Sequence, residues 1–511
     1  MFGAGAAALA GAAGISWWRR PARPAPLVDR RFPNCLRLPA ARGLHGLYDA
    51  PDRFTLVSRP IQHAVYPNRL VEMLGYEIED HGERYVNPVI RVRRGAQLRI
   101  RYWNALDEPS IVHWHGLKVD TNNDGHPHYA VEGGQTYDYQ FTVDNRASTY
   151  WYHPHPHHLA ARQAYRGLSG LFIVDDAEDR AVSQALGVHF GVTDVPLMMQ
   201  DKRFAQDGSL QYAPGPHAVH GHLGDTILVN LTSRPYLDVS TGWYRFRLLN
   251  ASNARIYRVA FLHDATPLAF HVIGGDGGLL GHPEAVRELY LAPAERADVV
   301  LDLRHASPGD RVMMASLPVD LLNAASSHAY EDVVPRTCEP LELLLLRVVW
   351  RQRSAGTLPT ALSRPPSSPA FDALPVRAFT LDFRNRSWRI NGSTYRMRET
   401  VFTVRRRSAE IWEFRSAGAA MPHPIHLHGY QFRILERLNA SAQARAASGR
   451  TDGIAAAERG WKDTALLWPG ETLRIGVDFS HPFSGDQVYM LQCHNLEHES
   501  HGMMVNFRVA A

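Results

Sequence analysis

The C-terminal stretch Gln487–Asn506, QVYMLQCHNLEHESHGMMVN, constrains this chain more than any other segment. A thiolate, two imidazoles and a weakly bound thioether are the ligands of a blue electron-transfer copper. In this stretch Cys493 would supply the thiolate, His498 one imidazole and Met503 the long axial contact. The second imidazole must come from elsewhere, and His423, in MPHPIHLHG, is the best candidate.

His-x-His spacing recurs along the chain. Residues two apart on a strand share a face, so each such pair can present two imidazoles on one side. Three pairs are complete: His113 and His115 in HWHG, His153 and His155 in WYHPH, and His426 and His428 in HLHG. His494 would belong to a fourth pair, but its partner position holds Gln492. Seven of the eight imidazoles that could enclose a buried three-copper cluster are therefore present.

These motifs, in this order and spacing, resemble those of the multicopper oxidases, which include laccases, bilirubin oxidases and bacterial cuprous oxidases. The resemblance extends from about Pro51 to the C-terminus. A single His-x-His pair is most simply a structural histidine pair, whereas four ordered motifs with a Cys-His-x3-His-x4-Met tail are hard to reach by chance. The resemblance implies an all-β protein built from three cupredoxin-like Greek-key β-sandwich domains.

The domain organisation expected from 511 residues is three units of ordinary size. Short alternating segments such as Val89–Val92 and Gln97–Tyr102 are typical of strands. The segments GAQLRIRY and GETLRIGV make the first and third units resemble each other. The predicted boundaries are a signal-like segment and lead-in at 1–50, domains at 51–180 and 187–353, a Ser/Pro/Ala-rich linker at 354–375, and a third domain at 376–511 that carries the blue copper.

The resemblance implies four coppers, and it distributes the ligands among them. The blue type 1 copper would be held by His423, Cys493, His498 and Met503. The type 2 copper would be held by His113 and His426. One type 3 copper would be held by His115, His153 and His494, and the other by His155, His428 and position 492.

Carboxylates near such a cluster can relay protons to oxygen during its reduction. Asp124 and Glu499 match acidic residues of the family, although Asp124-Gly125 also has turn chemistry. The sequence further suggests that Asp463 hydrogen-bonds an imidazole of the blue site.

Gln492 departs from the family, because an amide oxygen is a harder and weaker copper ligand than imidazole. Three hypotheses compete for the second type 3 copper. The cluster could still fill, with lower copper affinity and slower oxygen reduction. It could lack one copper, or His157 or His158 could compensate. We favour the first hypothesis, because every other ligand is retained.

The function implied is a laccase-like oxidase that couples one-electron oxidation of a phenolic, aromatic or metal-ion donor to reduction of dioxygen to water. None of the 11 methionines lies in the insertion Leu438–Arg459, which disfavours a cuprous oxidase with a Met-rich insertion. The alternatives are copper binding or electron transfer without turnover, and a scaffold in cell division, since some exported proteins share this fold without copper.

Composition excludes some partners. A formal net charge of +4 favours neither nucleic acid nor a polybasic membrane contact. The apolar segment Met1–Trp18 resembles the core of a secretory signal, so we expect a periplasmic or secreted protein with no membrane span, and a monomer. Cys35 and Cys338 could form a disulfide or remain two separate thiols.

Two further motifs carry weaker expectations. His220 and His222 have His-x-His spacing in a Gly/Pro-rich loop, which favours a solvated loop over a metal site. Asn230-Leu231-Thr232 matches a glycosylation sequon, but such a match is seldom used if the source is bacterial.

Overall fold

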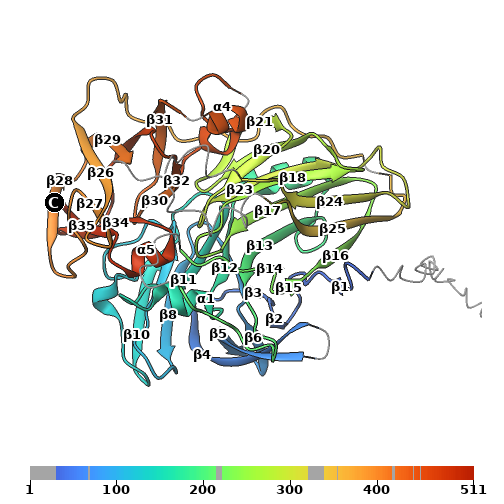
Figure 1. The fold of residues 1–511 in the computed structure, drawn as a ribbon, viewed down its shortest axis with the longest axis horizontal. Helices are drawn as coiled ribbons and strands as arrows, with labels where there is room; N and C mark the ends of the chain where they lie inside the picture. Colours follow the sequence, from blue (N-terminus) through green and yellow to red (C-terminus); the bar gives the residue numbers. More distant parts are fainter. Residues whose placement is uncertain are drawn as a thin grey trace, which may run out of the picture.

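The computed structural model describes residues 30–66, 69–214, 221–319, 339–353, 355–416, 421–440, 442–448 and 450–511. Their strands form six sheets that pack in pairs, and this confirms the expected all-β fold of three cupredoxin-like sandwiches. Figure 1 shows the first sandwich in blue and cyan, the second in green and yellow, and the third in orange and red.

The first sandwich packs the sheet β10-β8-β4-β5-β6-β2 against the sheet β3-β7-β12-β11-β9. In β8 every second side chain is buried, as the alternating sequence QLRIRYWN predicts for a strand with one face on a core. The strands are β2 Gly43–Leu44, β3 Leu47–Asp49, β4 Arg53–Tyr66, β5 Arg69–Asp80, β6 Glu83–Val86, β7 Val89–Arg93, β8 Gln97–Asn104, β9 Val112–His115, β10 Thr136–Thr142, β11 Ser148–Pro154 and β12 Gly170–Asp175.

The segment expected to be only a lead-in contributes to two domains. β2 and β3 add edge strands to the two sheets of the first sandwich. β1, Asn34–Cys35, pairs with β16 of the second sandwich. An extended, Pro-rich segment can add to sheet edges through its backbone, which the side-chain pattern does not reveal.

The second sandwich packs β1-β16-β25-β24-β18-β19, with β22 beside β18, against β15-β14-β13-β17-β23-β20-β21. Its strands are β13 Asp194–Lys202, β14 Thr226–Val229, β15 Thr232–Ser233, β16 Pro235–Ser240, β17 Trp243–Asn250, β18 Tyr257–His263, β19 Thr266–Pro267, β20 Phe270–Gly275, β21 Gly278–Val286, β22 Leu289–Leu291, β23 Arg296–Asp302, β24 Arg311–Ser316 and β25 Leu341–Trp350.

One expectation for this middle region is wrong, and one motif match has a buried acceptor side chain. His222 is buried, and its ring packs against Tyr165 and Tyr212 instead of lying in solvent; His220 lies outside the described residues. Asn230 is buried, and its side-chain amide donates to the carbonyls of Arg37 and Pro196, so this side chain is not accessible as a glycan acceptor.

The third sandwich packs β27-β26-β29-β33-β31 against β28-β35-β34-β30-β32. Within the insertion Leu438–Arg459 lie α4, Ala442–Ser448, and the 3-10 turn Ala456–Arg459. The strands are β26 Val376–Arg384, β27 Ser387–Ile390, β28 Thr400–Arg405, β29 Ala409–Ser416, β30 His423–Leu427, β31 Phe432–Leu438, β32 Thr464–Leu467, β33 Thr472–Asp478, β34 Gln487–Cys493 and β35 Met504–Ala510.

The segments between the sandwiches are packed. Helix α2, Ala177–Leu186, joins the first two domains; Asp176 caps its first turn and Gly187, with φ of 68°, ends it. Residues 355–375 run without strands along the second sandwich, where Leu362 is buried in its core. Small apolar clusters also join the domains; one consists of Ala161 and Ala164 of α1, Ala160–Tyr165, with Leu496 of α5, Leu496–Ser500. The region between the first and third domains is therefore a packed interface.

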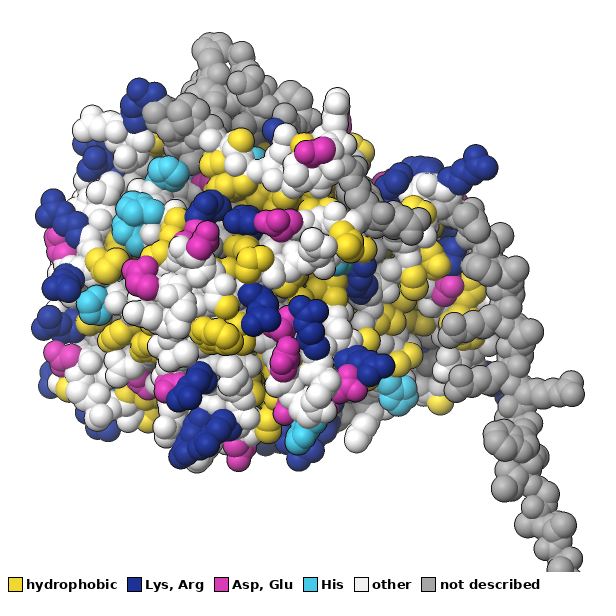
Figure 2. Space-filling view, turned by 90° about the horizontal axis from the view of Figure 1, so that it is seen from below, with side chains coloured by type: hydrophobic (Ala, Val, Ile, Leu, Met, Phe, Trp, Pro, Cys, Tyr) yellow, Lys and Arg dark blue, Asp and Glu magenta, His cyan; other side chains and the backbone are white. Residues whose placement is uncertain are grey.

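The surface and the termini bear on the expectations about nucleic acid, membranes and export. On the face shown in Figure 2, basic and acidic side chains are interspersed. Among the described residues, no helix is both long and apolar enough to cross a bilayer. Met1–Trp18 and Cys338 lie outside the described residues, so the export segment and the disulfide stay predictions.

Candidate metal centre

A buried thiol and two imidazoles converge at one end of the third sandwich. The Cys493 Sγ lies 3.5 Å from His423 Nδ1 and 3.6 Å from His498 Nδ1. Cys493 ends β34, His423 begins β30, and His498 lies in α5, so the three come from adjacent elements of one domain. Met503, which the sequence predicts as the axial ligand, is fully buried in the same core and donates its backbone N–H to the carbonyl of His498.

This group is screened from water by packing. The Trp388 ring lies with its centre 4.6 Å from that of His423 and 4.8 Å from that of His498. Burial lowers the pKa of His423 to about 3 and raises that of the Cys493 thiol. Neutral imidazoles are the form that binds a metal, and a bound cation would reverse the cost of ionising the thiol.

A second group of histidines lies between the first and third domains. β9 and β11 pair so that His153 stands opposite His113, and β30 and β34 pair so that His426 stands opposite Gln492. All seven histidines predicted for the cluster are buried. They are His113, His115, His153, His155, His426, His428 and His494.

The resemblance implies three sets of ligands, and contacts are found within each set, although His113 also stacks on His428 and His115 on His426. His113 Nε2 and His426 Nε2 lie 3.4 Å apart. His115 Nδ1 and His153 Nε2 also lie 3.4 Å apart, and the ring of His494 lies beside both. The third set is the ring of His155, the ring of His428 and the amide of Gln492. The converging groups His113, His115 and His153, and His113, His426 and His428, cut across these sets, so the assignment of ligands to the type 2 and type 3 coppers stays a prediction.

Unpaired polar atoms show that this group fits metal ions. Buried polar groups normally have hydrogen-bond partners. Among the described residues, none hydrogen-bonds His428 Nε2 or either ring nitrogen of His494. Burial, followed by the neighbouring His428, lowers the pKa of His113 well below its usual value, and burial lowers that of His494 to about 3. Several neutral imidazoles facing one space without partners are suited to bind metal ions.

The Gln492 amide takes the predicted place of the eighth ligand. Its Oε1 accepts a hydrogen bond from His155 Nε2 at 3.0 Å, and its Nε2 is buried without a partner. Neither His157 nor His158 joins the converging groups of His, Cys and acidic side chains found among the described residues. Instead, the rings of His157 and His158 stack, and His158 is exposed and bonded to the carbonyl of Ser500. This arrangement gives no support to the hypothesis that one of them replaces the missing imidazole, which stays a prediction.

The two carboxylates expected near the cluster lie against it. His428 Nδ1 donates to Asp124 Oδ2 at 2.8 Å, and His113 Nδ1 donates to the Asp124 carbonyl at 2.6 Å. Glu499 Oε1 lies 3.9 Å from His155 Nδ1, and neither Glu499 carboxyl oxygen has a hydrogen-bond partner in the part of the chain that the structure describes. Burial, and then the neighbouring Glu497, raises the pKa of Glu499 well above its usual value.

Asp463 is not at the blue site, so that expectation is wrong. His115 Nε2 donates to Asp463 Oδ1 at 3.1 Å, and His426 Nδ1 donates to the Asp463 carbonyl at 2.9 Å. Both imidazoles belong to the interdomain group. Asp463 also accepts from Arg296 of the middle domain, a residue to which the sequence patterns assign no role.

Comparisons with known proteins agree with this site. Models of the multicopper oxidase family match residues 77–179 and 369–511. The McoA multicopper oxidase of the hyperthermophile Aquifex aeolicus has a TM-score of 0.83 at 38% identity, covering 94% of this chain and 99% of that chain. Bilirubin oxidase of Albifimbria verrucaria is 30% identical over 88% of this chain and 75% of that protein. Cell division protein FtsP of Yersinia pestis is 31% identical, covering 82% of each. By its motifs, its fold and these relatives, the chain belongs to the multicopper oxidase family.

Proposed function

We propose that this protein is a copper-dependent oxidase that couples one-electron oxidation of a phenolic, aromatic or metal-ion donor to the four-electron reduction of dioxygen to water. The observation that carries the proposal is the convergence of the Cys493 thiol with His423 and His498, beside a histidine group that starts one residue away. A scaffold without copper would gain nothing from a buried thiol and unpaired buried imidazoles, since each unpaired polar group costs stability.

The residues that would hold copper follow from the three sets and the thiol site. Copper supplies one-electron redox chemistry and a place for dioxygen to be reduced. The expected holders are His423, Cys493, His498 and Met503 for type 1; His113 and His426 for type 2; and His115, His153, His494, His155, His428 and Gln492 for the type 3 pair.

The chain itself provides the connection and the protons. The backbone joins Cys493 directly to Gln492 and His494, so a short covalent path links the thiol site to the cluster. Burial, and then the neighbouring Glu497, raises the pKa of Glu499, which favours its protonated form, and its carboxyl lies beside His155. Asp124 orients His428 and His113. These positions support a proton-donating role for Glu499 and an orienting and relaying role for Asp124.

At Gln492 we propose that the second type 3 copper binds with reduced affinity. The amide oxygen already faces His155 Nε2, so both atoms point to the place where a shared metal ion would lie. Oxygen is a weaker donor to copper than imidazole, and binding must also break this hydrogen bond.

A second candidate function is a non-catalytic role in cell division. The similarity to FtsP favours it, together with the altered position 492. The two functions differ in one visible property, because only a protein with a filled thiolate site would be blue.

The test is oxygen consumption by copper-reconstituted protein with a phenolic one-electron donor, beside a Cys493→Ser variant. We expect a blue wild type with sustained oxygen uptake, and a colourless variant with no uptake. Cys35→Ser, in β1, is the matched cysteine control and should behave as the wild type. A colourless wild type would favour the cell-division role, and a blue protein without uptake would indicate electron transfer without turnover.

A further inference from the structure

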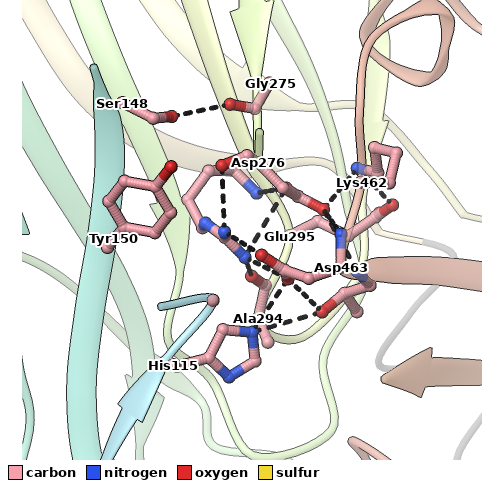
Figure 3. Close-up of polar contacts among 12 residues, drawn as sticks. His115, Ser148, Tyr150, Gly275, Asp276, Ala294, Glu295, Lys462 and Asp463 are labelled. Atoms are coloured by element: carbon pink, nitrogen blue, oxygen red, sulfur yellow. Dashed lines mark hydrogen bonds and ion pairs between the residues drawn. The ribbon is translucent and has the colours of Figure 1, made fainter. Parts of the chain in front are cut away.

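The middle domain contributes no predicted copper ligand, yet one of its side chains reaches the cluster. Arg296, at the start of β23, is fully buried, and its Nη1 donates to Asp463 Oδ1 at 2.7 Å while its Nη2 donates to Asp463 Oδ2. The same carboxylate accepts from His115 Nε2 at 3.1 Å, and Figure 3 shows Asp463 beside the ring of His115. An arginine of the second domain thus holds a carboxylate of the third, which holds an imidazole of the first.

The Asp463 carboxylate decides which nitrogen of His115 faces the cluster. A carboxylate only accepts hydrogen bonds, so His115 Nε2 must carry the proton in this contact. Nδ1 is then the nitrogen with a free lone pair, and it is the one that lies 3.4 Å from His153 Nε2.

His115 is opposite in this respect to four other imidazoles of the group. Those four donate from Nδ1, to the Asp124 carbonyl, the Pro154 carbonyl, the Asp463 carbonyl and the Asp124 carboxylate. They are His113, His153, His426 and His428, and each keeps Nε2 as its acceptor. The hydrogen-bond acceptor of each imidazole therefore determines which ring nitrogen faces the cluster. Among the acceptors named here, the Asp463 carboxylate at His115 is the one that also accepts from the middle domain, through Arg296.

The Arg296–Asp463 pair is embedded in further contacts between the domains. The Asp276 carboxylate accepts from the backbone N–H of Arg296 at 2.8 Å and lies 3.0 Å from Lys462 Nζ (Figure 3). Arg296 Nε also donates to the carbonyl of Thr149 in the first domain. Burial alone would lower the pKa of Arg296, but the carboxylates of Asp276 and Asp463 raise it above the usual value. The guanidinium is therefore a permanent charge that is fixed from all three domains.

Glycines leave the room that this arrangement needs. Gly116, which closes the HWHG motif, has φ of 86°, and a Cβ there would lie 2.5 Å from Asp463 Oδ2 and 2.9 Å from Arg296 Nη2. At Gly277, in the turn Gly274–Gly278, a Cβ would lie 2.5 Å from the Cβ of Trp461. The pair and its surroundings occupy space that only glycine provides.

We propose that Arg296 and Asp463 are positioning residues that hold His115 with Nδ1 toward the cluster, so that the middle domain fixes the geometry of a copper site whose ligands all come from the other two domains. Partners of this kind that orient metal-binding histidines typically change metal affinity about 10- to 100-fold when they are removed. The orientation of His115 is a property of the protein without metal. The proposal can therefore be tested separately from the proposed oxidase function.

The first measurement is the protonation of the His115 ring in copper-free protein, read from 15N chemical shifts of histidine-labelled wild type. The His115 signals would be assigned by their loss in a His115→Gln variant. We expect the proton on Nε2. A proton on Nδ1 of His115 in the wild type would overturn the proposal without any variant.

The second measurement uses Asp463→Asn and Arg296→Lys. The asparagine side chain has one acceptor oxygen, and its NH2 group only donates, so it cannot replace both carboxylate oxygens of Asp463. A lysine at position 296 cannot reproduce the bidentate contact of the guanidinium. We expect both variants to lose the fixed Nε2–H form of His115 and to bind cluster copper about 10- to 100-fold more weakly, with the larger effect for Asp463→Asn. The blue absorbance should remain, because the imidazoles that hydrogen-bond Asp463 are those of His115 and His426, which are predicted cluster ligands.

Glu295→Gln is the matched control. Glu295 lies 3.0 Å from Lys462 Nζ in the same ionic cluster, and it does not hydrogen-bond His115 or Asp463 in the described structure. This variant should keep both the His115 signals and the copper affinity. Equal effects of Glu295→Gln and Asp463→Asn on the His115 signals would reduce the pair to a general structural role and contradict the proposal. Retained blue colour in each variant reports that the third domain is folded.

Discussion

The thiol site and the histidine cluster adjoin each other in sequence but are built differently. The thiol site takes its four residues from one domain, on β30, β34, α5 and the segment just after α5. The cluster takes His113, His115, His153 and His155 from the first domain and the remaining histidines from the third. The thiol site therefore depends on the core of one domain. The cluster depends on how the first and third domains dock and, by our proposal, on Arg296 of the middle domain.

The difference also appears in how closely each site keeps the family pattern. The thiol site has all four expected residues, while the cluster has an amide at Gln492. In a set of eight ligands, the loss of one imidazole leaves seven to hold the ions. In a four-residue site the loss of the thiolate would remove the site. The comparison predicts that changes at the cluster alter copper occupancy by degrees.

The largest expected effect is that of restoring an imidazole at position 492 of the cluster. Gln492→His replaces an amide oxygen by a nitrogen donor, and we expect at least about tenfold tighter binding of the last copper, with faster oxygen uptake. Copper per chain would be measured by metal analysis during titration with a chelator. Gln487→His, at the other end of β34, is a control for adding a histidine. Unchanged copper stoichiometry and oxygen uptake in Gln492→His would show that the amide is an adequate ligand.

The next largest expected effect is a difference between the two sites in the denaturant concentration at which each loses its signal. The cluster needs the first and third domains to stay docked, so we expect oxygen uptake to be lost at a lower guanidinium chloride concentration than the blue absorbance. A difference of about 2 kcal/mol in local stability corresponds to about 0.5 M denaturant. Both signals would be followed in one titration of copper-loaded protein. Coincident midpoints would mean that the domains unfold as one unit.

The pH dependence of Glu499 should give the smallest effect. An unfolded glutamate ionises near its ordinary pKa of 4.5, whereas burial, and then Glu497, raises the pKa of Glu499 well above it in the folded chain. Above pH 4.5 the folded state keeps a proton that the unfolded state loses, so the free energy of unfolding falls as pH rises, until the folded pKa is reached. The slope from this one group is at most about 1.4 kcal/mol per pH unit.

Glu499→Gln would test this in copper-free protein. We expect the variant to show a flatter dependence of unfolding free energy on pH above 4.5, measured by denaturant titration at several pH values. Glu132→Gln, at an exposed turn, is the matched control and should keep the wild-type dependence. The same slope in Glu499→Gln and wild type would show that this carboxyl does not retain its proton on folding.

The sequence by itself predicted the parts of the protein that depend on local periodicity and spacing. The alternation in Gln97–Tyr102 predicted β8, because a strand buries every second side chain against one core. The His-x-His pairs and the Cys493 segment predicted which imidazoles gather, since two-residue spacing on a strand fixes the face on which each side chain lies. The all-β fold and the family followed from the same motifs.

Only the tertiary structure decided the contacts between segments far apart in the chain. Nothing in the sequence near Arg296 indicates that it meets Asp463, 167 positions away, or that Asp463 lies at His115 and not at the thiol site. The burial of His222 and Asn230 and the edge strands in the lead-in were equally hidden. Such contacts depend on how whole domains pack, and a residue pattern that fixes the direction of a side chain does not specify its partner in another domain.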